Sequence, residues 1–383
     1  MFKRFSGAAA ALDMLIDCCR PLRGTEILQT VMAEGRVLSQ DVASAVSLPA
    51  FDRAAMDGFA VHSAETLGAR PHAPVFLERF LPIGTGMPVP ADYDAVVMLE
   101  DSDRHGSVLE VTAQIHPYRN VSRVGEDISA GDTVLSEGHT LRPPDLALLS
   151  ALGIAEVQVY EKPKVVIIPT GGKLLEIGSR ALFAGEAYEI NGLMARLYAE
   201  KWGASAKKTR IVPDDESLVR EALRANEDAD LIIIIGGTSI GEKDYAPKVL
   251  SEMGELFVHG VRLQPGKPTA IGAVAGKPVV CLPGYPVAML MDLYFFVRPA
   301  LQKIGHRNDP QPAVKAKLAR KIPSRPGYLS LVRVALKDGE AEPIMISGAG
   351  ILSSVARADG FVIVSEEKEG LEAGETVNVL LFE

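Results

Sequence analysis

A glycine-rich loop after a wholly apolar segment carries the clearest chemical signal in this chain. The sequence LIIIIGGTSIGEKDY spans residues 231–245, and its loop begins with Gly236 and Gly237. Glycines let backbone N–H groups approach an anion closely, and the start of a following helix adds a positive dipole. Ser239 can donate a hydroxyl, and the Asp244 carboxylate suits a hard cation such as Mg²⁺. The segment predicts either a phosphate and metal site or a tight strand-to-helix turn capped by Asp244.

Three further loops combine glycine or proline with a group that could contact a ligand. Residues 264–268 read QPGKP, in which Lys267 could hold an oxyanion as a point charge. Residues 281–286 read CLPGYP, in which two prolines fix the backbone. Residues 51–60 read FDRAAMDGFA and place Asp57 before a glycine. Each loop also fits a turn without a ligand, so the loops are informative only in combination.

Size and charge limit the classes of protein that could present these loops. A chain of 383 residues is too long for one ordinary core, so two to four domains are expected. The net charge of −9 argues against a nucleic-acid-binding protein, and an anionic ligand would need local positive charge or backbone donors.

Membrane insertion and secretion are not expected either. No apolar run reaches membrane-spanning length, and Asp13 and Asp17 make the N-terminal segment an amphipathic helix rather than a signal peptide. Three cysteines cannot form a disulfide framework, so we expect a reducing, cytoplasmic location. The seven histidines show no zinc-ligand spacing.

The pattern of apolar residues changes three times along the chain. Residues 1–35 read as helical, and residues 36–140 contain short β-like runs among prolines and glycines. After residue 310 the helical period disappears, and the turn signal Asp338-Gly339 predicts a hairpin in a small β domain. Between them the chain alternates expected strands at 165–168, 231–235, 257–263 and 279–282 with expected helices at 191–202, 217–225, 246–253 and 287–304. This alternation predicts a doubly wound, mostly parallel sheet that binds ligands at the carboxyl ends of its strands.

The loops taken together resemble the molybdopterin molybdenumtransferase family, which includes the catalytic E domain of gephyrin and its plant counterpart. The family patterns include D-x-S-A-M-D-G-Y/F-A, G-G-V-S-V-G-x-x-D-Y, P-G-K-P and L-P-G-N-P. The resemblance covers nearly the whole chain and rests on residues 51–60, 84–90, 94–100, 120–131, 168–178, 236–245, 265–268 and 282–286. It implies an α/β multidomain subunit that forms an elongated homodimer. The implied parts are a helical linker region (1–35 and 141–161), a β-rich inserted domain (36–140), a doubly wound molybdopterin-binding domain (162–304) and a C-terminal β-barrel-like domain (305–383).

The resemblance also implies an activity and its residues. The family inserts molybdate into adenylylated molybdopterin and releases molybdenum cofactor and AMP with Mg²⁺, and possible partners belong to cofactor synthesis or molybdoenzyme maturation. Catalytic positions carried over from the motifs are Asp57, Thr85, Asp127, Lys173, Asp214 and Asp244, of which Asp57, Asp214 and Asp244 would hold the metal. Ligand-binding positions carried over in the same way are Thr170, Gly171, Gly236, Gly237, Ser239, Gly241, Tyr245, Pro265, Gly266, Lys267, Pro268, Pro283, Gly284, Pro286 and Arg333.

The chain departs from the family patterns at chemically important places. The family sequence T-G-D-E-L is TGGKL at residues 170–174, so Gly172 and Lys173 replace two acids. An ammonium at Lys173 would repel a Mg²⁺ that the family's carboxylate would attract, and the nearest acid in sequence is Glu176. In the L-P-G-N-P element the asparagine is Tyr285, and the serine that often follows is Ala288.

Three functions fit these observations. The first is a molybdenum insertase acting on adenylylated molybdopterin. The second is a catalytically weak or inactive protein that binds or delivers molybdopterin, which Lys173 favours. The third is a nucleotide hydrolase that shares only residues 162–304, which the motifs in residues 51–131 argue against. Fold alone cannot separate them, because function depends on the site.

Overall fold

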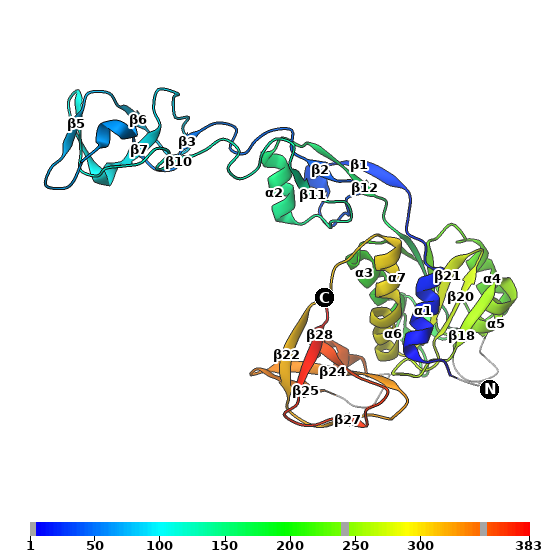
Figure 1. Cartoon of the computed structure of the whole chain (residues 1–383). Helices are drawn as coiled ribbons and strands as arrows, with labels where there is room; N and C mark the ends of the chain where they lie inside the picture. The colour runs from blue at the N-terminus through cyan, green and yellow to red at the C-terminus, as the bar shows by residue number, and fades with distance from the viewer. Residues whose placement is uncertain (1–4, 239–244, 345–350) are drawn as a thin grey trace. The chain divides into compact units, whose positions relative to one another are not determined.

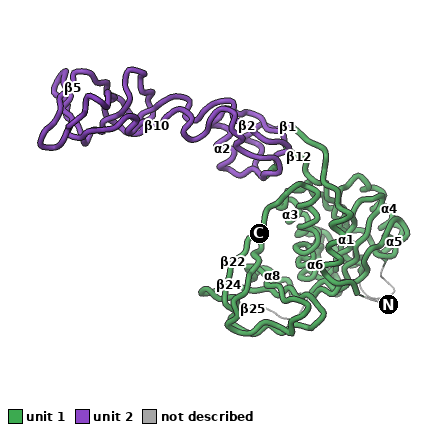
Figure 2. Tube along the Cα trace, viewed as in Figure 1, with its two compact units in different colours: residues 1–26, 35–37, 159–383 green, residues 27–34, 38–158 purple. Residues whose placement is uncertain are grey.

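The computed structural model describes residues 5–238, 245–344 and 351–383, which form two compact units (Figure 2). Unit 1 comprises residues 1–26, 35–37 and 159–383, and unit 2 comprises residues 27–34 and 38–158. Within the described ranges, no helix has both the length and the apolar composition that a membrane crossing requires.

A six-stranded sheet forms the centre of unit 1, as the alternating pattern predicted. Four neighbouring strands are parallel, namely β16 (Ser205–Lys208), β13 (Lys164–Pro169), β17 (Leu231–Ile235) and β21 (Lys277–Leu282). The sheet continues through β20 (Ala270–Val274) to its edge strand β18 (Glu255–His259), both in antiparallel pairings. Every residue of β17 is buried, because helices cover both faces of the sheet.

The two faces of the sheet carry different sets of helices (Figure 1). Ile233 and Ile235 pack with α1 (Ala8–Cys18), α3 (Asn191–Lys201), α6 (Pro286–Asp292) and α7 (Arg298–Ile304). Ile232 and Ile234 point to the opposite face and pack with α4 (Glu216–Arg224) and α5 (Tyr245–Met253). Successive residues of one strand therefore enter two separate cores.

Two elements of this sheet differ from the sequence prediction. The expected strand 257–263 is β18, which ends at His259, and β20 between it and β21 was not predicted. The expected single helix 287–304 contains a π-helical segment, η4 (Leu293–Val297), between α6 and α7. The doubly wound, mostly parallel sheet itself is confirmed.

The C-terminal part of unit 1 is a closed ring of five strands, so the expectation of a barrel-like domain is confirmed. Around the ring the order is β22 (Ala313–Leu318), β28 (Thr376–Leu381), β26 (Gly360–Val364), β24 (Leu329–Lys337) and β25 (Glu340–Pro343), and β25 pairs again with β22. Asp338 and Gly339 both have positive φ between β24 and β25, which confirms the predicted hairpin. The pair β23 (Ile322–Pro323) and β27 (Gly370–Leu371) and the helix α8 (Leu352–Ala356) accompany the ring.

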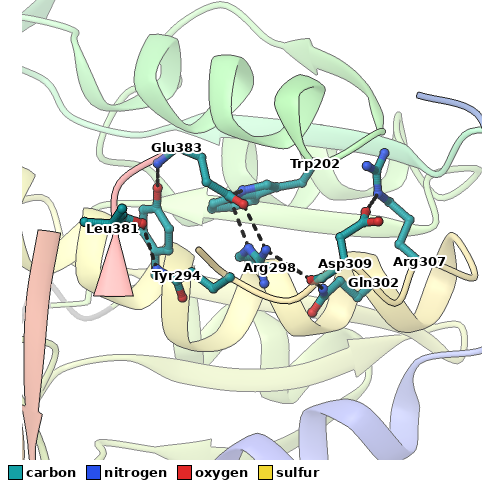
Figure 3. A network of polar contacts seen from close by, with 9 residues as sticks. Trp202, Tyr294, Arg298, Gln302, Arg307, Asp309, Leu381 and Glu383 are labelled. Carbon is teal, nitrogen blue, oxygen red and sulfur yellow. Dashed lines mark hydrogen bonds and ion pairs between the residues drawn. The ribbon is translucent and has the colours of Figure 1, made fainter. Parts of the chain in front are cut away.

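One backbone pairing and one cluster of side-chain contacts fasten this ring to the sheet domain. The short strand β19 (Leu263–Gln264), directly before Pro265, pairs in parallel with β24 through Leu263 and Leu329. At the other end of the ring, the Glu383 carboxylate accepts hydrogen bonds from Arg298 of α7 and from the Trp202 indole (Figure 3). Arg298 and Glu383 are both largely buried, so this ion pair is shielded from solvent.

Unit 2 is rich in short strands, as its sequence predicted. One sheet has the order β6 (Leu81–Ile83), β4 (Gly58–Val61), β7 (Ala95–Met98), and another β5 (Val75–Leu77), β9 (Val108–Val111), β8 (Ser102–His105). Phe59, Val97 and Leu109 join the two sheets in one core. The remaining elements are β2 (Val42–Ala43) with β11 (Thr133–Leu135), β3 (Arg53–Ala54) with β10 (Val121–Ser122), the 3-10 turns η2 (Ser63–Thr66) and η3 (Leu99–Asp101), and α2 (Pro143–Ala151).

The helical character expected over residues 1–35 is limited to a shorter segment. Among the described residues of this range, α1 ends at Cys18, where Cys19 is already extended and Pro21 cannot continue the helix. Residues Thr25–Gln29 form β1, which pairs with β12 (Glu156–Tyr160), and η1 (Thr30–Met32) follows. The four-part division of the chain stays a prediction.

Candidate functional site

The carboxyl ends of three parallel strands in unit 1 lead into the loops that sequence motifs singled out. Loop 170–173 follows β13, Gly236 follows β17, and loop 283–285 follows β21. Because parallel strands end at the same edge, these loops surround one cavity of about 410 Å³, here called the loop cavity. Among the residues that line it are Thr170, Gly171, Lys173, Asp214, Gly284 and Pro286.

Asp214 is held in the loop cavity by two donors. Its Oδ2 accepts the Gly172 N–H at 3.0 Å, and its Oδ1 accepts the hydroxyl of Tyr245. The same Tyr245 hydroxyl lies 3.3 Å from Thr170 Oγ1. Burial, and secondarily the Asp214 carboxylate, raise the pKa of Tyr245, so the phenol stays protonated and donates. Motifs 75 residues apart in sequence thus form one hydrogen-bonded cluster.

Gly236 and Gly237 adopt conformations that require glycine. Their φ angles are +96° and +63°. A Cβ on Gly236 would lie 2.7 Å from the Thr170 carbonyl oxygen, and one on Gly237 would lie 2.6 Å from the Tyr245 ring. Close packing against the Asp214 cluster therefore explains both glycines. Ser239, Gly241 and Asp244, which the same motif predicted, lie outside the described residues.

Lys173 is an exposed cation at the mouth of the loop cavity, near Gly185. The pKa of the neighbouring Glu186 carboxyl falls to about 2, first because of Arg180, then the Phe183 N–H, with a smaller contribution from Lys173. Glu176, the nearest acid in sequence, accepts two hydrogen bonds from Lys208 at 2.9 and 3.0 Å. Glu176 is not among the residues that line the loop cavity, so it does not replace the missing acids there.

Two lining residues of the loop cavity were missed by sequence reasoning. Glu189 and Asn191 stand at the start of α3 and are buried, with 3% and 9% of their surface exposed. In the sequence they are indistinguishable from ordinary residues at a helix start, so only the fold identifies them. Leu174–Leu175 (β14) pairs with Ala187–Tyr188 (β15), which brings this segment back beside Lys173.

A second cavity of about 610 Å³, here called the anion cavity, lies between the sheet domain and the five-stranded ring. Residues 265–268, with Lys267, and Pro283 line one side, and Arg325 and Arg333 line the other. Arg333 is 4% exposed, and its Nε has no hydrogen-bond partner among the described residues. Burial lowers the pKa of Arg333, and no described carboxylate pairs with it. The ammonium of Lys267 lies 4.6 Å from the centroid of the Phe5 ring.

The loop 283–286 separates the two cavities. Tyr285 lines the anion cavity, whereas its neighbours Gly284 and Pro286 line the loop cavity. Asn191 donates from Nδ2 to the Gly284 carbonyl at 2.7 Å, which fixes this loop. A ligand with an anionic group and a ring could therefore contact both cavities from one loop.

Comparison with known proteins decides the family. A model described as "MoeA N-terminal region (domain I and II)" matches residues 7–153, one described as "Probable molybdopterin binding domain" matches 166–303, and one described as "MoeA C-terminal region (domain IV)" matches 315–382. Molybdopterin molybdenumtransferase 2 of Mycobacterium tuberculosis is 33% identical over 95% of this chain and 96% of its own length. The chain belongs to the molybdopterin molybdenumtransferase family.

Other similar proteins support the same family assignment. The molybdopterin molybdenumtransferase of Haemophilus influenzae is 30% identical over 94% of each chain. The crystal structure of the molybdopterin biosynthesis MoeA protein from Pyrococcus horikoshii matches with a TM-score of 0.89 and 32% identity, covering 99% of this chain and all of that one. Because the match extends over the whole chain, a hydrolase sharing only residues 162–304 does not fit.

The motif residues of unit 2 form their own small cluster. Asp57 Oδ1 accepts the Thr85 N–H at 2.7 Å, and this bond lowers the pKa of Asp57. Asp127 is exposed, and its N–H donates to the Leu48 carbonyl. Asp57 and Thr85 thus lie together, whereas their functional roles stay predictions. Asp57 and Asp214 belong to different units, and in the described parts of the chain no three metal-ligating side chains gather.

Behind the family's P-G-K-P turn lies a buried acid. Asp292 is fully buried, and its Oδ2 accepts the Thr269 hydroxyl while Oδ1 has no partner among the described residues. A Cβ on Gly266 would lie 2.1 Å from Asp292 Oδ1, so only glycine fits against this carboxyl. Desolvation raises the pKa of Asp292 well above its usual value.

The Asp292→Asn variant tests this buried acid through the pH dependence of stability. The unfolded state ionises near pH 4, whereas the folded state retains the proton, so the wild type loses stability as pH rises from about 4 to the raised pKa. Asparagine does not titrate. We expect the unfolding free energy of the variant relative to wild type to increase by up to about 1.4 kcal/mol per pH unit in that window. Urea unfolding at pH 5, 6.5 and 8, monitored by Trp202 fluorescence, measures this difference in unfolding free energy between variant and wild type. A difference that does not change with pH would contradict a buried, protonated Asp292.

Proposed function

We propose that this chain inserts molybdate into adenylylated molybdopterin with release of AMP, in a Mg²⁺-dependent reaction in the cytoplasm. The observation that carries the proposal is Arg333, a buried guanidinium with no carboxylate partner among the described residues, in a cavity shared with Lys267. A buried cation lacking an anion is costly unless a ligand completes it, and molybdate is a tetrahedral dianion that suits guanidinium and ammonium donors.

The loop cavity would receive the phosphate and ring of the adenylylated substrate. Gly236 and Gly237 follow β17 at the carboxyl edge of the sheet, where phosphate loops stand, and they allow this backbone to pack closely against Thr170 and Tyr245. Asp214 would bind Mg²⁺, which supplies charge neutralisation on the phosphoanhydride, and Asp57 and Asp244 would complete the metal site. The chain's own contribution is to position the phosphoanhydride beside molybdate, so that its cleavage is coupled to metal transfer.

The placement of the motifs in two different units motivates a proposal about assembly. Asp57, Thr85 and Asp127 lie in unit 2, whereas Asp214 and Arg333 lie in unit 1. We propose a homodimer in which unit 2 of one subunit completes the site of the other, with the four-part domain division given by the family. Partners in cofactor synthesis or molybdoenzyme maturation would receive the product.

The test is release of AMP from adenylylated molybdopterin, measured by chromatography with and without molybdate and Mg²⁺. We expect release that requires both. Lys173 favours the alternative of a binding or delivery protein, because its ammonium stands where the family has a carboxylate. Tight binding of the substrate without AMP release under any condition would refute the insertase and support that alternative.

A further inference from the structure

Two residues that line the loop cavity each carry a buried oxygen atom with no hydrogen-bond donor among the described residues. The two atoms are Glu189 Oε2 and Asn191 Oδ1. Of the five buried side-chain polar atoms without a partner among the described residues, these two share one cavity. A buried acceptor left without a donor costs free energy, so a pair of them in a cavity indicates a ligand that supplies donors.

Existing bonds fix the chemistry of both atoms. Glu189 Oε1 accepts the Gly192 N–H at 2.6 Å at the start of α3, which leaves Oε2 as the unused oxygen. Asn191 Nδ2 donates to the Gly284 carbonyl, so the amide oxygen is the unused atom. Neither group can rotate to satisfy itself without breaking these bonds. Both remaining atoms are acceptors, so the missing partners are donors.

The surroundings favour neutral N–H donors over a metal ion. Lys208 Nζ lies 3.6 Å from Glu189 Oε2, too far for a hydrogen bond but close enough to repel a divalent cation. The other lining residues include Leu174, Ile190 and Ile235, which offer apolar contact to a flat ring. A heteroaromatic ring with an amino group next to a ring N–H offers two neighbouring donors and a flat apolar face, and so matches two acceptor oxygens beside apolar side chains.

We propose that Glu189 and Asn191 read the 2-amino-4-oxopyrimidine edge of a pterin ring, and so set the ring specificity of the loop cavity. The amino group and the adjacent ring N–H donate to Glu189 Oε2 and Asn191 Oδ1. This assignment rests on the proposed function for the identity of the substrate. Beyond the proposed function, it names Glu189 and Asn191 as the residues that distinguish a pterin with a 2-amino group from a ring with a carbonyl at position 2.

The experiment compares pterin with lumazine, which carries an oxygen in place of the 2-amino group. Fluorescence titration of the full chain should show that pterin binds about tenfold more tightly than lumazine. The reason is that the 2-oxo group of lumazine, a hydrogen-bond acceptor, would face an acceptor oxygen of the protein. Glu189→Gln keeps the Oε1 bond to Gly192 but replaces Oε2 with a donor, and we expect it to abolish the preference or reverse it. Glu176→Gln is the matched control, since Glu176 also contacts Lys208 but does not line the cavity, and it should keep the preference.

The outcomes separate this inference from the proposed function. Equal binding of the two rings, no binding of either at millimolar concentration, or an unchanged preference in Glu189→Gln would overturn the inference. Trp202 fluorescence in the free protein checks that the Gln variant is folded. AMP release does not enter this test, so a protein that prefers pterin but releases no AMP would refute only the insertase.

Discussion

Arg333→Met is expected to lower kcat/KM for molybdate by about 10²–10³, roughly 3–4 kcal/mol of transition-state stabilisation. The guanidinium is buried in the anion cavity, and no carboxylate in the described part of the chain pairs with it, so a bound oxyanion would be its counter-charge. The same substitution should raise the unfolding free energy without molybdate by about 1–3 kcal/mol, because a desolvated, unpaired charge is removed. Steady-state AMP release at varied molybdate concentrations measures the change in kcat/KM. Urea unfolding measures the change in the unfolding free energy.

Arg325→Met is the matched control for this prediction. Arg325 lines the same cavity but is exposed and lies over the Tyr328 ring, 4.9 Å from its centroid. Its removal should change stability by no more than about 0.5 kcal/mol. A stability gain for Arg333→Met alone, together with its loss of molybdate dependence, identifies Arg333 as the ligand-binding charge. A destabilised Arg333→Met with wild-type KM for molybdate would make the residue structural.

Restoring both acids, as Gly172→Asp with Lys173→Glu, should increase Mg²⁺-dependent AMP release about tenfold, which corresponds to roughly 1.4 kcal/mol. The structure supplies a specific reason. A Cβ on Gly172 would lie 3.4 Å from Asp214 Oδ2, and Gly172 does not have a positive φ in the left-handed region, so an aspartate fits and places its carboxylate beside Asp214. Two adjacent carboxylates without the Lys173 ammonium favour a divalent cation.

The neutral pair Gly172→Asn with Lys173→Gln controls for size and for loss of the ammonium. It should give less than the full gain in AMP release, and its Mg²⁺ affinity by titration calorimetry should stay below that of the acidic pair. A native protein already as fast as a relative carrying both acids would contradict the argument. So would an acidic pair that folds normally by circular dichroism but gains nothing.

Features governed by local sequence could be predicted well. The apolar run 231–235 specified a strand buried on both faces, and Asp338-Gly339 specified a hairpin. Asp57 with Thr85, and Thr170 with Tyr245, came from matching motifs, and the structure brings each pair together. Lys267 and Arg333 likewise line one cavity.

Features that depend on packing between distant segments could not be predicted. β20 contains Gly272, which in sequence weakens a strand; in the structure a Cβ there would lie 2.1 Å from the Glu255 carbonyl oxygen of β18. The acid nearest Lys173 in sequence, Glu176, bonds instead to Lys208, whereas Glu189 lines the cavity. Sequence distance to a motif is therefore a poor guide to which carboxylate reaches it.

The short strand β19 also gives the five-stranded ring a mechanical role. Because Leu263 and Gln264 pair with Leu329 and Ser330, the turn that carries Lys267 hangs directly from the strand that carries Arg333. Lys267 and Arg333 are thus attached to paired backbone segments, and this pairing restrains the distance between them. A displacement of the ring would therefore also shift this turn, because the two-residue pairing of β19 with β24 couples them.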